Sequence, residues 1–254
     1  QRLELLDRLW ARTTVRVDAP GPDGERERTQ GEGYLQLIQP RSVSLSVGKY
    51  IDRMYFVLGS NDERYWWIDL LDTDAKSALV GRHELVTPEL AGELGVPVHP
   101  LDLIDLLGLS PIDDDALLAR GEERDGQRML VLAMPTRLGG VREVAIEPNE
   151  PKTLGVRLLD TSGELIASSD LEMHTAARVR SGILALVPGR ATLDLPTLDA
   201  SVILDVSSAE NMGRRPRPAP FQLDNLIERI YRIDNVIDLD SPETRSEIDR
   251  LRRS

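Results

Sequence analysis

The chain has 254 residues, a formal net charge of −12 at pH 7 and no cysteine. Its 43 acidic residues outnumber the 31 lysines and arginines, a balance that argues against nucleic acid as a partner. Without cysteine the chain cannot form disulfides, thiolate nucleophiles or thiolate metal sites. No apolar run approaches the roughly 20 residues that a membrane-spanning helix needs, so none is predicted.

The first residue is Gln1 rather than methionine. We therefore expect that an upstream segment has been removed, and a secretory signal peptide is one candidate. A signal that ends in a lipidated cysteine would anchor the protein to a membrane.

Apolar residues at helical spacing open the chain, at Leu3, Leu6, Leu9 and Trp10. They predict an amphipathic helix over residues 2–12. Beyond this helix the period changes to two, which is typical of strands. Strands are predicted in close succession at residues 14–17, 33–38, 43–47, 53–58 and 64–70. Because short polar turns join them, we expect an antiparallel meander.

Two glycines, Gly31 and Gly33, lie at the start of the second of these strands. A dinucleotide-binding loop would need a preceding strand, a third glycine and a following helix. Instead, apolar Leu35 and Leu37 alternate with polar neighbours until Pro40 ends the run. The pair therefore opens a strand and does not predict a phosphate site.

Helix starts follow in the middle of the chain, where a hydroxyl N-cap precedes proline and an early acid. This pattern occurs at Thr87, at Ser110 and, near the C-terminus, at Ser241, with a weaker version at His99. The helix predicted over residues 100–107 is apolar around most of its circumference. Other elements must therefore bury it.

Candidate catalytic and metal-binding groups are few. The aspartates at 113–115 follow Ser110 in the first turn of a predicted helix, where acids offset the macrodipole, so capping is favoured over a metal cluster. His83, His99 and His174 are widely separated and lack the spacing of a metal triad. Because the sequence contains no nucleophile elbow, Walker loop or zinc-helix motif, we predict that the protein is not an enzyme.

A second run of strands follows the helical segment. These strands are predicted at residues 128–134, 141–146, 154–160, 165–171, 190–195 and 201–206. The total is about eleven strands with a helical insert after the fifth. We expect one domain over residues 1–240, mainly β with helices (α+β), followed by a C-terminal helical tail at residues 241–254.

This order of elements, and two stretches within it, resemble a known superfamily. The stretches are GEGYLQLIQPRSVSLSV at residues 31–47 and GSNDERYWWIDL at residues 59–70. They are similar to the periplasmic lipoprotein carrier and receptor proteins, the LolA/LolB-like superfamily. The resemblance implies a half-open antiparallel β-barrel of about eleven strands around a central apolar cavity, with helices as a lid.

The resemblance also implies a function. The superfamily binds acyl chains of lipoproteins or lipids in that cavity, without covalent chemistry or a cofactor. We expect a monomer that is periplasmic or anchored to the outer membrane of a bacterial cell envelope. A membrane surface is a further candidate partner, because Arg214, Arg215 and Arg217 could meet anionic headgroups. The alternative for that stretch is a solvated extended loop.

Two positions depart from the carrier's pattern. In the carrier, a basic residue that helps to govern lid closure precedes the strand-ending proline, and this chain has Gln39 there. An aromatic residue lies three positions after that proline, where this chain has Val43. These departures bear on the shuttling mechanism more than on the fold.

The cavity lining is predicted from the alternating strands and the apolar helix. The expected side chains are those of Leu35, Leu37, Val43, Leu45, Val47, Phe56, Trp66, Leu103, Leu106 and Leu107. A one-residue register error would expose the opposite set, so the inward parity of each strand stays open. Plain core packing is the alternative for each residue. Trp66 and Trp67 face opposite ways, so at most one of them lines the cavity.

Two functions from different classes stay open. The leading one is an envelope protein that carries or docks an acyl chain, since each buried methylene contributes about 0.8 kcal/mol. The second is an envelope scaffold or sensor that uses the same barrel for protein contacts, with its own side chains filling the cavity. A hydrolase would require a polar cluster inside the cavity, and the sequence offers no candidate.

Overall fold

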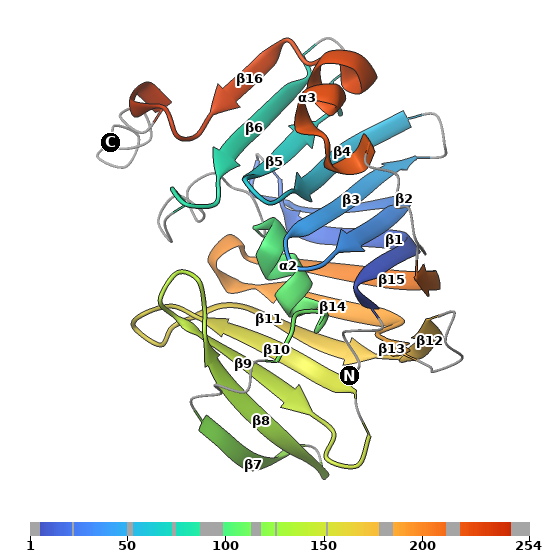
Figure 1. Ribbon diagram of the computed structural model, residues 1–254, viewed down its shortest axis with the longest axis vertical. Helices are drawn as coiled ribbons and strands as arrows, with labels where there is room; N and C mark the ends of the chain where they lie inside the picture. Colours follow the sequence, from blue (N-terminus) through green and yellow to red (C-terminus); the bar gives the residue numbers. More distant parts are fainter. Residues whose placement is uncertain are drawn as a thin grey trace.

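The structure is a computed structural model. It describes residues 6–21, 23–49, 53–72, 75–86, 99–112, 118–124, 126–150, 152–177, 185–211 and 219–244. Its main feature is one curled sheet of 14 strands, in the order β16-β6-β5-β4-β3-β2-β1-β15-β14-β11-β10-β9-β8-β7 (Figure 1). The strands of this sheet are β1 (Arg8–Pro20), β2 (Arg26–Ile38), β3 (Ser42–Lys49), β4 (Arg53–Ser60), β5 (Arg64–Asp69), β6 (Ser77–Arg82), β7 (Leu118–Arg124), β8 (Gln127–Pro135), β9 (Val141–Ile146), β10 (Thr153–Leu159), β11 (Leu165–Glu172), β14 (Arg190–Leu195), β15 (Ala200–Asn211) and β16 (Asn235–Asp238).

The remaining elements are short. Two strands, β12 (Thr175–Ala177) and β13 (Ala185–Val187), form a separate antiparallel pair. The helical segments are α2 (Pro100–Leu106), η2 (Pro196–Leu198), η3 (Ala219–Phe221), α3 (Leu223–Asn225) and the π-helical turn η4 (Leu226–Tyr231).

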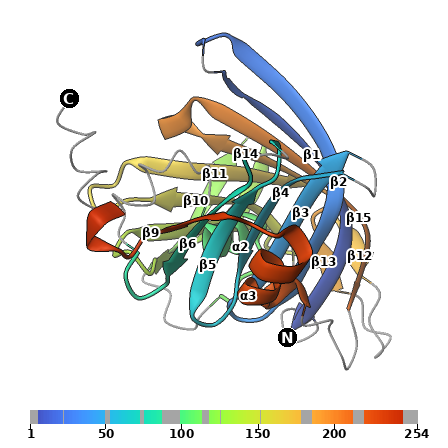
Figure 2. The ribbon, with the colours of Figure 1, turned by 90° about the horizontal axis from the view of Figure 1, so that it is seen from above.

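Two antiparallel runs of strands meet to make the large sheet. Strands β1 to β6 form one meander, and β7 to β11 form a second run that β14 and β15 extend. Strand β15 pairs with β1, with Val15 opposite Leu204, and this pairing joins the two runs. In Figure 1, α2 lies between the β1–β6 run and the β8–β11 run, and seen from above the sheet curls around the helix (Figure 2). The helix is therefore held inside the curl of the sheet.

The sheet remains open. Its edges in the described part of the chain are β7 and β16, and β16 pairs in parallel with β6. The expected mainly β class is confirmed, together with a curled sheet that does not close. The expected barrel of about eleven strands is corrected to an open sheet of 14 strands.

Every strand predicted from alternation is present, and the prediction missed β6, β7 and β16 of the large sheet as well as the short pair β12 and β13. Strand β6 reads as a short apolar run because both of its faces are covered: Ala78 and Val80 belong to one apolar cluster and Leu79 packs against the other. Strand β7 has the sequence LARGEER. It lies at an edge of the sheet and most of it is exposed, so apolar and polar residues do not alternate along it. Strand β16 has only four residues.

The predicted N-terminal helix is wrong where the structure describes it. Strand β1 begins at Arg8, while residues 1–5 lie outside the described residues. Leu9 faces the inner core, and Trp10 on the opposite face stacks on Tyr34 with ring centroids 5.5 Å apart. Pairing with β2 on one side and β15 on the other overrides the local helical spacing.

The apolar helix predicted over residues 100–107 is confirmed as α2. His99 caps it, because its Nδ1 atom accepts a hydrogen bond from the amide of Leu101 at 3.2 Å. The buried residues of α2 surround its axis, as expected of a helix enclosed by a sheet.

Other predicted helix starts have mixed outcomes. The Thr87 start and the aspartates at 113–115 lie outside the described residues. The expected cap at Ser241 is present, since its hydroxyl accepts a hydrogen bond from the amide of Thr244 at 3.1 Å. The chain beyond residue 244 lies outside the described part.

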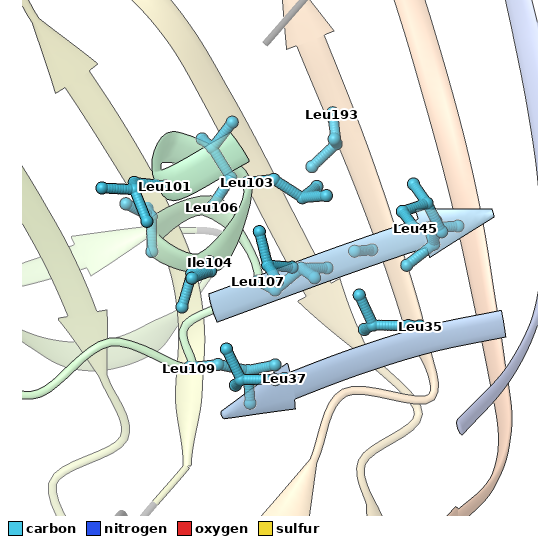
Figure 3. Packing of buried hydrophobic residues seen from close by; sticks show 14 of the residues in the cluster. Leu35, Leu37, Leu45, Leu101, Leu103, Ile104, Leu106, Leu107, Leu109 and Leu193 are labelled. Atoms are coloured by element: carbon cyan, nitrogen blue, oxygen red, sulfur yellow. The ribbon is translucent and has the colours of Figure 1, made fainter. Parts of the chain in front are cut away.

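Apolar side chains form two clusters on opposite faces of the sheet. The inner cluster covers the concave face and includes α2 (Figure 3). The outer cluster lies on β4–β6 and includes Trp66 and Ile68, which are covered by Leu223 and Leu226 from α3 and η4. The C-terminal segment therefore covers part of the outer face, while the inner face contains the candidate site.

Candidate functional site

An apolar cavity of about 680 Å³ opens on the concave face of the sheet. Its walls come from β1–β4, β14, β15 and α2, so both ends of the chain contribute to it. Leu103 of α2 points toward the same space as Leu45 of β3 and Leu193 of β14 (Figure 3). Most lining side chains are aliphatic or aromatic, which makes the cavity suited to a hydrocarbon ligand.

The residues predicted from the sequence to line the cavity fall into three groups. Four of them line it, namely Leu45, Val47, Phe56 and Leu103. Five lie in the same inner cluster at no more than 1% exposure and are core residues rather than lining residues, namely Leu35, Leu37, Val43, Leu106 and Leu107. Trp66 lies on the opposite face of the sheet.

The parity chosen for Trp66 is corrected by the structure. Trp66 is fully buried in the outer cluster, beneath Leu223 and Leu226. Trp67 belongs to the inner cluster and meets Tyr65 edge-on at 5.2 Å between ring centroids. Both faces of β5 are covered, so two adjacent tryptophans give no local indication of which one faces inward.

Sequence reasoning missed much of the wall. The missed apolar lining residues are Val15, Val17, Tyr55, Leu58, Leu71, Leu193, Val202 and Leu204. The alternation of apolar and polar residues along β1, β14 and β15 does indicate which residues of each strand share a face. What the alternation could not show is that β15 pairs with β1, which brings Val202 and Leu204 beside Val15 and Val17.

The glycine pair that opens the second predicted strand has a packing role. A Cβ atom on Gly33 would collide with the backbone carbonyl oxygen of Ser46, and one on Gly31 would collide with the side chain of Val47. Strands β2 and β3 approach closely at this point only because both positions lack a side chain. Gly31 itself lines the cavity, so this close approach shapes the cavity wall.

Helix α2 is fixed to the sheet by polar contacts as well as by apolar packing. The hydroxyl of Ser169, on β11, donates to the carbonyl of Leu106 at 2.6 Å. Arg142, on β9, pairs with Asp105, and Arg137 pairs with Asp102 at 3.2 Å. Both acidic side chains of the helix are therefore bound to arginines, which holds α2 in place within the wall.

Gln39 contributes to the same attachment. In the sequence resemblance, Gln39 stands in place of a basic residue of the carrier. Its side-chain amide donates to the carbonyl of Leu109, just after α2, at 2.6 Å. A neutral donor at this position thus still connects the strand end to the segment that follows the helix.

Two histidines that are far apart in the sequence meet beside α2. The ring centroids of His83 and His99 are 5.6 Å apart, and the ring of Tyr65 is 4.6 Å from that of His99. Burial lowers the pKa of both histidines, and the charge of Arg137 lowers it further; the pKa of His99 falls well below 6.5. Both rings are neutral at neutral pH, so they serve as packing around the first turn of the helix.

The carboxyl group of Asp102 is also perturbed. Burial raises its pKa from 3.8 to about 6, and the nearby Arg137 charge only partly offsets this. The side chain keeps 27% of its surface exposed, so solvent still reaches it. Neither this group nor the histidines lie among the cavity-lining residues.

Two charged stretches singled out from the sequence cannot be placed. The aspartates at 113–115 and the cluster of Arg214, Arg215 and Arg217 lie outside the described residues. Within the described ranges, no group of three or more histidines and acids is placed to hold a metal ion. None of the described helices has the length and apolar character needed to cross a bilayer.

Comparison with known proteins finds similarity in structure and none in sequence. No family model matches the chain, and no curated protein matches its sequence. A DUF1329 family protein from Desulfovibrio piger is similar with a TM-score of 0.57 and 11% identity, over 88% of this chain and 93% of that one. A LolA superfamily protein from Nitrosomonas europaea has a TM-score of 0.54 and 13% identity, over 91% of this chain and 95% of that one.

A third similar structure is a domain assigned to outer membrane lipoprotein sorting, from Vibrio parahaemolyticus. Its TM-score is 0.53 at 10% identity, over 89% of this chain and 91% of that one. Identities this low establish the fold alone. The chain therefore shares the fold of LolA superfamily proteins, and the resemblance predicted from its sequence is confirmed at that level.

Proposed function

We propose that this protein binds the acyl chain of a lipid or lipoprotein in its concave cavity, as a carrier or docking protein of the bacterial cell envelope. The binding involves no covalent chemistry. The apolar cavity of about 680 Å³ is the observation that carries the proposal. The similar structures support it, because they include a LolA superfamily protein and a domain assigned to outer membrane lipoprotein sorting.

The size and lining of the cavity suit an alkyl chain. Its volume of about 680 Å³ lies within the roughly 300–1,000 Å³ typical of small-molecule sites. Each methylene moved from water into an apolar wall contributes about 0.8 kcal/mol, so six buried methylenes contribute about 5 kcal/mol. This binding free energy does not depend on hydrogen bonds or other directional contacts, and the aliphatic side chains of the wall form none.

The cavity is preformed rather than created by the ligand. Leu103 is 2% exposed and belongs to α2, which hydrogen bonds and ion pairs hold against the sheet. Leu71 lines the same cavity but is 59% exposed. A hydrocarbon chain can therefore enter beside Leu71 without displacing the helix.

Two measurements test this proposal directly. Native mass spectrometry of the purified protein would reveal a copurified lipid, and displacement of a fluorescent fatty-acid probe would measure binding. Val47→Trp adds bulk at a half-buried lining position and should weaken probe binding by about tenfold or more, which corresponds to 1.4 kcal/mol. Val236→Trp is the matched control, because Val236 is 45% exposed on β16 and does not line the cavity.

The outcome separates the two functional classes. Probe binding that Val47→Trp weakens and Val236→Trp leaves unchanged supports an acyl-chain site. A protein that copurifies with no lipid and does not bind the probe contradicts it. That result would favour the alternative, in which the same fold serves as a scaffold or sensor for protein contacts.

A further inference from the structure

Two positively charged side chains lie at the open end of the apolar cavity. Lys49 ends β3 and Arg53 begins β4, and both are exposed residues that line the cavity. Among the described lining residues they are the only charged ones. The whole chain has a net charge of −12, so a cavity whose charged residues are all cationic departs from the overall composition.

The register of the strands places both cations on the cavity side. Val43, Leu45 and Val47 alternate toward the concave face along β3, and Lys49 continues this alternation. Arg53 lies directly opposite Lys49 on β4. Residues directly opposite each other in an antiparallel pair project from the same face, so Arg53 also faces the cavity.

A β-bulge turns Arg53 toward this face. The register between β3 and β4 shifts after Val47, which leaves Tyr55 as an extra residue on β4. Met54 is thereby directed to the opposite face, where it packs against the outer cluster. Without the bulge, Met54 would take the inward position and Arg53 would face outward. Bulges of this kind commonly re-aim a side chain at a barrel rim or beside a functional site.

The pair of cations is unfavourable in the absence of an anion. Like charges directly opposite on neighbouring strands destabilise a sheet. Neither Lys49 nor Arg53 has an acidic partner among the described residues. The guanidinium of Arg53 lies over the ring of Tyr55, 5.8 Å from its centroid, and this cation–π contact keeps the charge at the cavity mouth.

We propose that the ligand is an anionic amphiphile. Its acyl chain lies in the apolar cavity, and its negative head group, a carboxylate or a phosphate, binds between Lys49 and Arg53. Thr29 of the neighbouring strand β2 also lines the cavity, opposite the lining residue Val17, and its hydroxyl supplies an uncharged hydrogen-bond donor. This inference rests on the proposed acyl-chain function and adds selection by head-group charge.

The experiment compares amphiphiles that share one acyl chain and differ in the head group. Myristate carries a carboxylate, myristoyl lysophosphatidate carries a phosphate, and monomyristoylglycerol is neutral. Each competes with a neutral fluorescent naphthylamine probe, below its critical micelle concentration. The proteins are the wild type, the double variant Lys49→Gln/Arg53→Gln, and Arg12→Gln as a matched control. Arg12 is exposed on β1, on the face opposite Ala11 and Thr13, and lies outside the cavity.

The wild type should bind the anionic amphiphiles about tenfold more tightly than the neutral one, a difference of 1.4 kcal/mol. The double variant should lose this advantage and retain its affinity for monomyristoylglycerol, whereas Arg12→Gln should behave as the wild type. Concentrated salt should reduce the advantage, because it screens exposed charges. Equal affinity of all three amphiphiles for the wild type, unchanged in the double variant, would overturn the inference while the acyl-chain function stands.

The remaining outcomes separate the two sources of negative charge and the two proposals. A preference for both anionic amphiphiles indicates recognition of any anionic head, and a preference for the lysophosphatidate alone indicates a phospholipid head group. Both results support the inference. Failure of every amphiphile to displace a bound probe would contradict the acyl-chain function itself, and the inference would then fall with it.

Discussion

Replacing Ser169 with alanine tests whether α2 is a fixed part of the cavity wall. Ser169 lies on β11 and is 5% exposed. Its hydroxyl donates to the carbonyl of Leu106 in α2 at 2.6 Å and accepts from the amide of Val156 on β10 at 3.2 Å. A single oxygen atom therefore connects the helix to two strands.

The structure sets the expected magnitude. Leu106 is 0% exposed and Val156 is 1% exposed, so water cannot replace the lost hydroxyl at either backbone group. A buried group left unsatisfied costs about 1–3 kcal/mol, and the pair should cost about 2–4 kcal/mol after some relaxation. Each kcal/mol lowers the Tm of a domain of this size by roughly 2–4 °C, so we expect a decrease of at least about 4 °C.

Urea denaturation followed by circular dichroism measures the change in the free energy of unfolding. Hydrogen exchange adds a local measurement, because the amide of Leu107, bonded to the carbonyl of Leu103 at 3.0 Å, should exchange faster in the variant. Ser168→Ala is the control, since Ser168 is the adjacent residue and faces the opposite side of the sheet. Equal effects of the two substitutions, or a loss below about 0.5 kcal/mol for Ser169→Ala, would refute the anchoring role.

Further predictions concern the helix and its titrating neighbours. Leu106→Ala should lower the free energy of unfolding by about 4 kcal/mol, because Leu106 is fully buried. Leu103→Ala should lower it by only about 2 kcal/mol, because Leu103 already borders a cavity. Urea denaturation that finds the larger loss for Leu103→Ala would contradict this packing. Burial lowers the pKa of His99 well below 6.5. As the pH falls below 6.5, this histidine therefore takes up a proton in the unfolded chain, whereas its buried ring in the folded chain does not. The stability advantage of the wild type over His99→Asn should therefore shrink between about pH 7 and about pH 5, and a constant difference would contradict a buried neutral ring. The pH dependence of stability has the opposite sign for Asp102, because its folded pKa of about 6 exceeds the ordinary value of 3.8. The wild type should therefore gain stability relative to Asp102→Asn as the pH falls through about 6. A relative loss of stability would contradict the raised pKa.

Several parts of the fold followed from local residues. Period-2 alternation located β1–β5, β8–β11, β14 and β15, and a histidine–proline start located α2. Alternation also assigned Leu45 and Val47 to one face of β3 and Ser44 and Ser46 to the other, and in the structure Leu45 and Val47 line the cavity. Such features depend on interactions between neighbours in the chain.

Other features depended on residues that are distant in the sequence. No local pattern could show that Val15 lies opposite Leu204, that His83 meets His99, or that β16 pairs with β6. The N-terminal helix was predicted wrongly for the same reason. Its residues satisfy a helical spacing, but pairing on both sides of β1 decided the outcome.

The sequence by itself determined which side chains share a face, since alternation along a strand follows from backbone geometry alone. Only the tertiary structure decided which face is the inner one, where the two runs of strands join and which charges reach the cavity. Trp66 and Trp67 are equally apolar, and their assignment depends on what covers each side of β5. Arg53 reaches the cavity because a bulge against β3 shifts its parity, and a shift between paired strands is invisible in either strand read alone.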